Sequence, residues 1–152
     1  MLIESKPVVT ATLALLLSLL LSGAAPADGV APFVDLGNGL PGNFGLVPEL
    51  TGVGTLVPGD DVTLTVVKSA KSSMAYLVVG TAADYTPLLG GTLVPRPRLF
   101  IGPLQTRKGT VVLSADWLAN MPAGTSAFLQ FWILDGSAVQ GYSASNGLMV
   151  TP

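Results

Sequence analysis

From about residue 47 onwards, short apolar stretches alternate with turn signals along the chain. The clearest example is 62–68, where Val62, Leu64 and Val66 alternate with threonine residues. This period of two places one row of side chains in a core and the other row in solvent, as in a β-strand. The turn signals recur roughly every 8 to 15 residues, a spacing that is typical of a β-sandwich or barrel.

The pattern predicts an all-β fold of seven to eight strands without a long helix. The expected strands cover residues 48–57, 62–68, 74–80, 91–94, 99–102, 109–115, 125–134 and 142–151. Residues 74–80 are apolar on both faces and should lie at the centre of a sheet, while the aromatic-rich stretch 125–134 should form the core. The expected architecture is an antiparallel, two-layer sandwich of the immunoglobulin-like type.

The connections between these strands also have sequence signals. Residues 81–90 are expected to form a loop, and Asp116 could cap a single helical turn over 116–121. Pro95 and Pro97 cannot donate to a ladder, so the segment around them belongs at a sheet edge. The Asn146-Gly147 pair predicts a bulge or kink in the last strand.

The N-terminal region predicts export. Residues 1–27 contain Lys6, an apolar run over 8–21 and a small-residue cleavage signal that ends at Ala27, with Ala24 as the competing site. The run has about 14 residues, short of the roughly 20 that span a bilayer as a helix. We therefore expect a signal peptide over 1–27, a Gly/Pro-rich leader over 28–46 that is at most partly ordered, and a sandwich domain over 47–152. The protein should then be secreted, or lie in the periplasm or cell envelope.

Composition narrows the class of partner. Charged residues make up 11% of the chain, against roughly 25% in typical soluble domains. Without Lys6 and Glu4, six cations and eight anions remain, so there is no basic patch for nucleic acid. The chain has no cysteine and must rely on packing without disulfides. We expect contact with other extracellular or envelope proteins, with a second copy or with a glycan, and with a membrane only through the transient signal peptide.

Catalytic chemistry has little support in the sequence. The chain contains no histidine, which removes the most common general base and metal ligand. Asp60 and Asp61 are adjacent and would point to opposite faces of a strand, so they should not act as an acid–base pair. Asp84, Asp116 and Asp135 each lie next to a turn, where an aspartate side chain bonds nearby backbone amides. We therefore expect no enzyme activity, no cofactor and no metal site.

Two aromatic residues are candidate ligand contacts. Tyr85 and Trp117 fall in predicted loops and could stack on the faces of sugar rings. Tyr76 and Trp132 lie on predicted central strands, where core packing is the better interpretation. A carbohydrate-binding module is therefore the alternative to a module for protein interaction or extracellular structure.

Four segments form a further pattern. They read L-V-x-G at 77–80, P-x-x-G-G-T-L-V-P at 87–95, P-A-G-T-x-x-x-L-Q-x-W-x-x-D at 122–135 and S-A-S-N-x-L at 143–148. This pattern resembles a C-terminal β-sandwich domain appended to many large exported proteins of environmental bacteria. The resemblance implies an exported β-sandwich and carries no activity over to this chain. The same positions also suit the fold, because Asn146 and its neighbouring serines can bond backbone groups at a strand irregularity.

Overall fold

A computed structural model describes residues 31–117 and 119–152. The predicted signal peptide, 1–27, and the first residues of the predicted leader lie outside this part of the chain. Ala31–Pro152 forms one compact unit. Its elements are β1 Phe33–Gly37, the 3₁₀ turn η1 Asn43–Gly45, β2 Glu49–Val53, β3 Asp61–Val67, β4 Met74–Gly80, β5 Ala83–Leu88, β6 Gly91–Pro95, β7 Leu99–Gln105, β8 Val111–Asp116, β9 Ala127–Leu134, β10 Tyr142–Ala144 and β11 Gly147–Val150.

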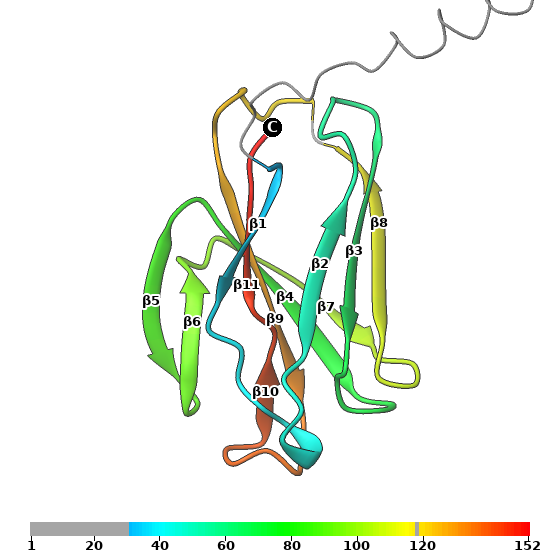
Figure 1. Ribbon diagram of the computed structural model, residues 1–152, viewed down its shortest axis with the longest axis vertical. Coiled ribbons are helices and arrows are strands. Elements are labelled where there is room, and N and C mark those ends of the chain that lie inside the picture. Colours follow the sequence, from blue (N-terminus) through cyan, green and yellow to red (C-terminus); the bar gives the residue numbers. More distant parts are fainter. Residues whose placement is uncertain (1–30, 118) are drawn as a thin grey trace, which may run out of the picture. The chain divides into compact units, whose positions relative to one another are not determined.

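The strands form two sheets and a separate hairpin, all antiparallel (Figure 1). The large sheet has the order β1-β11-β9-β4-β7, and β10 also pairs with β9. The small sheet has the order β2-β3-β8, and among the described strands β5 pairs with β6 alone. The prediction of an all-β antiparallel sandwich is confirmed. In the described residues, no helix is long and apolar enough to cross a membrane.

Seven of the strands follow an immunoglobulin-like order. Taken along the chain, β2, β3 and β8 are the first, second and fifth of these seven, and together they form the small sheet. The sixth strand, β9, lies between the third, β4, and the seventh, β11, as in that fold. The fourth strand, β7, pairs with β4 in the large sheet, whereas the constant-type fold places it in the small one. Four additional strands, β1, β5, β6 and β10, raise the total above the predicted seven to eight.

The core between the two sheets follows from the period of two. On β3, Val62, Leu64 and Val66 are buried and the intervening residues are partly exposed. From the large sheet, Leu129, Phe131 and Ile133 of β9 pack against them in the same cluster. The predicted central position of 74–80 is also correct, because β4 lies between β9 and β7.

The other face of the large sheet carries a second, smaller core. It consists of Val78, Leu93, Trp132 and Ala144, and it includes residues of β4, β6, β9 and β10. The β5–β6 hairpin therefore forms a third layer on the outer face of the large sheet, at the left in Figure 1. This layer explains why β4 and β9 are apolar on both faces.

A buried glutamine ties the hairpin to the large sheet. The Gln130 side chain is fully buried, and its Oε1 accepts hydrogen bonds from the Val94 amide at 2.9 Å and from Trp132 Nε1 at 3.2 Å. Its Nε2 donates to the carbonyls of Thr92 at 3.1 Å and Ser145 at 3.0 Å. The partners fix the orientation of the amide, because N–H groups need the oxygen and carbonyls need the NH₂ group.

A second polar pair joins the two sheets where the last strand breaks. The backbone leaves the ladder at Ser145 and Asn146, between β10 and β11, which agrees with the irregularity predicted there. Ser145 Oγ accepts from the Phe131 amide and donates to the Asn146 carbonyl. Asn146 Oδ1 accepts from the Leu50 amide at 2.7 Å, and its Nδ2 donates to the Leu50 carbonyl at 3.1 Å. The Asn146 amide thus pairs with β2 as a backbone peptide group would.

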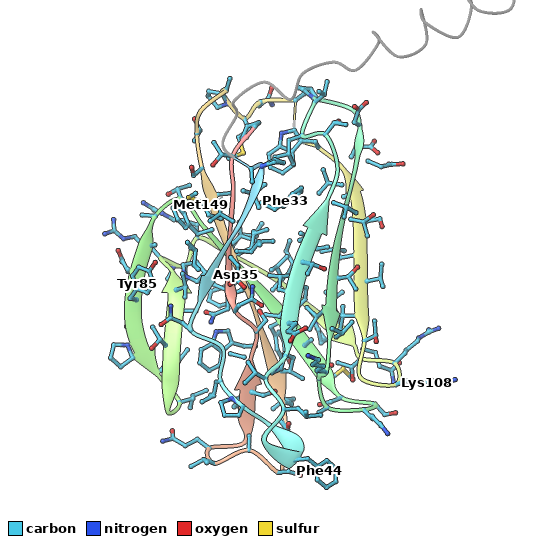
Figure 2. The ribbon with its side chains drawn as sticks, viewed as in Figure 1. Phe33, Asp35, Phe44, Tyr85, Lys108 and Met149 are labelled. Atoms are coloured by element: carbon cyan, nitrogen blue, oxygen red, sulfur yellow. The ribbon has the colours of Figure 1, made fainter. Side chains whose placement is uncertain are left out.

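The predicted Gly/Pro-rich leader over 28–46 includes a regular strand at residues 33–37. They form β1, which pairs with β11, and Leu40 makes a further bridge to Ala144. Phe33 packs against the main core, and this apolar contact stabilises the strand despite its glycine-rich surroundings. The Asp35 carboxylate accepts a hydrogen bond from the Gly37 amide, at the point where the strand ends (Figure 2).

Two other local predictions are also corrected. Residues 81–90 contain strand β5 instead of being loop throughout, because Thr86–Leu88 can pair with β6 across the turn at Leu89 and Gly90. Residue 116 ends strand β8, so Asp116 does not cap a helical turn; it lies opposite Asp61 in the ladder. No helix occurs in the described residues of 116–121.

We predict that Gln130→Met destabilises the protein by about 3 kcal/mol, because it leaves buried amide and carbonyl groups without partners at nearly unchanged volume. Urea denaturation measures this change. Gln105→Met on β7, where the side chain is exposed, is the matched control and should change stability by less than about 0.5 kcal/mol. Equal effects of the two substitutions would show that the Gln130 hydrogen bonds do not hold the hairpin.

Candidate binding surfaces

Tyr85 lies on the outer strand of the hairpin. It belongs to β5, at an irregularity between Ala83 and Thr86, and has a positive φ of 52°. Its side chain is 46% exposed and lies on the outer side of the hairpin (Figure 2). An exposed ring held by an unfavourable backbone conformation remains a candidate contact, although the residue lies in a strand and not in the expected loop.

Trp117 follows β8 and has a different environment. Its ring is half-buried and packs against the main core, and its Nε1 is shielded from solvent without a hydrogen-bond partner. A shielded, unpaired N–H costs free energy, so burial of the ring must outweigh that cost. The structure does not bring Tyr85 and Trp117 together, because the cleft that Trp117 lines contains no residue of the hairpin.

The aromatic side chains instead gather around a groove on the outer face of the large sheet. This aromatic groove is formed by Tyr76, Phe100, Trp132 and Tyr142, with Leu88 and Leu89 at the tip of the hairpin. Its volume is about 390 Å³. Phe100 is 63% exposed, Tyr76 and Tyr142 are half-buried, and Trp132 forms the buried floor.

Sheet pairing explains how these rings meet. Tyr76 of β4 lies opposite Trp132 of β9, and Val78 lies opposite Phe100 of β7. Tyr142 on β10 pairs with Leu134 on β9 and belongs to the partly buried rim of the second core. Residues on one face of neighbouring strands form continuous rows, so the groove crosses the sheet from β10 to the edge at β7.

A second hollow, which we call the side cleft, lies between the two sheets. It has a volume of about 270 Å³, and its lining includes Leu99 and Ile101 of β7 and Leu113 and Ala115 of β8. These are the two edge strands on the side away from β1 and β2, which contact each other. Asp116 is the one charged residue among the described lining residues.

An ion pair closes the open end of the hairpin. Arg96 Nε donates to Asp84 Oδ2 at 2.7 Å and Arg96 Nη2 donates to Asp84 Oδ1 at 3.0 Å, which is a bidentate arrangement. This hydrogen bonding lowers the pKa of Asp84 below its ordinary value of 3.8 and raises the pKa of Arg96. Both side chains are substantially exposed, so the pair contributes modestly.

Three other cations near β7 have no such partner. Arg98 precedes the strand, and Arg107 and Lys108 follow it. All three are exposed and form no ion pair within the described part of the chain, and Lys108 extends into solvent at the turn before β8 (Figure 2).

The described acidic residues form no group of three or more that could hold a metal ion.

Sequence reasoning identified the rings of this groove only in part. It assigned Tyr76 and Trp132 to the core, which is correct for Trp132 at 4% exposure but incomplete for Tyr76. It gave no role to Phe100 or Tyr142. The available signal was the apolar run Leu99-Phe100-Ile101 next to the proline-rich segment predicted at a sheet edge, because one face of an edge strand has little cover.

No protein family, curated protein or solved structure matches the chain.

We predict that the Asp84–Arg96 pair makes the hairpin sensitive to acid. Because the pKa of Asp84 is lowered in the folded state, the stability contributed by the pair is complete above the ordinary value of 3.8 and is lost as the pH falls through the lowered value. Hydrogen exchange of β5 and β6 amides, followed from neutral pH to about pH 2, measures the effect.

Asp84→Asn and Arg96→Gln should each remove this acid-dependent step in β5 and β6. The rest of the large sheet provides the internal reference. An unchanged acid profile in Asp84→Asn would mean that another group is responsible.

Proposed function

We propose that this protein is an exported, non-catalytic β-sandwich module that binds other extracellular or envelope proteins. The aromatic groove is the observation that carries the proposal. Its rings and the hairpin tip place apolar side chains at the surface next to one another, with Phe100 at 63%, Leu88 at 39% and Leu89 at 36% exposure. Contiguous exposed apolar surface of this kind marks interaction sites, and aromatic residues dominate the binding energy at such sites.

The scarcity of charge supports the same function. The described residues contain six Lys and Arg side chains, and none of them lines the aromatic groove. A surface with little charge has weak self-repulsion and can pack closely against another protein. The export that this proposal includes rests on the N-terminal sequence pattern and on the family resemblance described above.

Site-directed cross-linking tests the proposal. A photo-reactive amino acid at position 100, in the full-length protein expressed in cells, should give a discrete adduct with an envelope or secreted protein. Position 139 is the matched control, because Val139 is 96% exposed and lies outside the groove. We expect at least about fivefold more of that adduct from position 100, because the apolar groove should hold the partner there. Equal yields from both positions, or none, would contradict the proposal.

A glycan is the second candidate ligand, because Tyr76, Phe100 and Tyr142 could present ring faces and two phenolic hydroxyls to a sugar. A glycan array probed with the purified full-length protein should then show a signal that Phe100→Ala and Tyr142→Ala each reduce about tenfold or more. Tyr85→Ala, on the outer side of the hairpin, is the control. A signal that Tyr85→Ala abolishes and Phe100→Ala leaves intact would place the sugar at the predicted contact Tyr85 instead of the groove.

A further inference from the structure

Strand β7 borders both the side cleft and the aromatic groove. Leu99 and Ile101 point into the side cleft, and Phe100, between them, lines the aromatic groove. β7 is also the last strand of the large sheet, so no strand of the described residues pairs with its outer edge. Leu99 is 53% exposed and Phe100 is 63% exposed. The strand is thus uncovered along its edge and only partly covered on its two faces.

An unpaired edge of this kind binds extended peptides by strand addition. Main-chain hydrogen bonds to the edge supply affinity, and pockets for alternate side chains supply specificity. A strand added beside β7 would direct successive side chains to opposite faces of the sheet. One row would then enter the mouth of the side cleft next to Leu99 and Ile101, and the other row would pack on Phe100 at the end of the aromatic groove.

We propose that β7 is a docking edge for an extended segment of a partner protein, with apolar residues on both faces and acidic residues at its ends. This inference rests on the proposed function and assigns its binding site. The middle of the partner segment must be apolar at every position, because the side cleft and the aromatic groove are both lined mainly by apolar side chains. An alternating segment would place polar groups in one of them, which costs free energy.

The charges around β7 specify the ends of the segment. Arg98 lies before the strand, and Arg107 and Lys108 lie after it, without ion pairs in the described part of the chain. Acidic residues at both ends of an added strand would meet these cations. A second copy that pairs through its own β7 would instead bring like charges together, and this disfavours such a dimer.

The length of pairing is limited by Pro103. β7 loses its regular register with β4 between the pairs Ala75–Leu104 and Leu77–Ile101, and Pro103 has no N–H to donate. The regular part of the edge is therefore residues 99–101. Main-chain pairing of about three to five apolar residues is expected there, and the acidic ends of the segment extend beyond it, past Pro103, to approach Arg107 and Lys108.

Binding of a designed peptide tests the proposal. The probe is a peptide of five alternating valine and leucine residues with two aspartates at each end, titrated into the full-length protein and followed by amide chemical shifts and hydrogen exchange. We expect protection of residues 99–101 and saturable binding that weakens with salt. The same peptide with a methylated backbone should bind at least about tenfold more weakly, because methyl groups block the main-chain hydrogen bonds.

Variants of the protein distinguish peptide binding at the β7 edge from non-specific binding to apolar surface. Leu99→Asp should weaken peptide binding at least about tenfold, and Arg98→Glu about fivefold with a reduced salt dependence, because Arg107 and Lys108 remain. Val53→Asp is the matched control, because Val53 is 64% exposed on β2, an edge strand of the small sheet. It should leave binding unchanged, and the chemical shifts of each variant establish whether it is folded.

The remaining outcomes overturn the inference. Protection of β8 instead of β7 would place the added strand at the other edge of the side cleft, and concentration-dependent protection of β7 without peptide would identify a second copy as the occupant. Tight binding of the backbone-methylated peptide, or of a lipid-like apolar probe, would show that the side cleft and the aromatic groove hold apolar ligands without strand addition. Cross-linking from position 100 without peptide binding would retain the proposed function and reject strand addition.

Discussion

The structure depends on one constraint: the buried Gln130 amide must satisfy its partners on the outer face of the large sheet. β9 has the sequence of a strand covered on both faces, and it places a polar side chain in the row that faces the hairpin. Burying that group alone would cost several kcal/mol. The cost is offset because the Val94 amide and the Thr92 carbonyl also need partners once β6 lies on the sheet. The glutamine and the hairpin therefore satisfy each other's buried polar groups.

The same network reaches the small sheet through the break between β10 and β11. Gln130 donates to the Ser145 carbonyl, Ser145 Oγ holds the Phe131 amide, and Asn146 pairs with both backbone groups of Leu50. The three layers thus meet at the side chains of Gln130, Ser145 and Asn146. A chain without cysteine has no covalent crosslink between its layers, and these buried hydrogen bonds provide directional ties that apolar packing lacks.

This convergence also explains which features the sequence predicts well. Alternation in 62–68 and the doubly apolar stretch 74–80 determine burial directly, so their strands and central positions were predictable. β1 was not, because its stability comes from the free edge of β11 and from packing of Phe33, neither of which is local in sequence. Of the hairpin, β6 was predicted and β5 was not, because β5 is mostly exposed and gives no alternating pattern. The aromatic groove depends on strand order, which brings Tyr76, Trp132 and Phe100 into adjacent rows only after folding.

The position of the hairpin links the buried network to the surface. The β5–β6 pair is inserted between β4 and β7, which are neighbours in the large sheet. Its anchor is Gln130 on β9, so the hairpin covers the sheet near β9 and β10 and leaves the outer side of Phe100 on β7 exposed. If the hairpin were anchored one strand nearer to β7, it would cover that ring and close the groove. The residue that satisfies the interior thus also determines how much apolar surface remains for a partner, although it lies outside the lining of the groove.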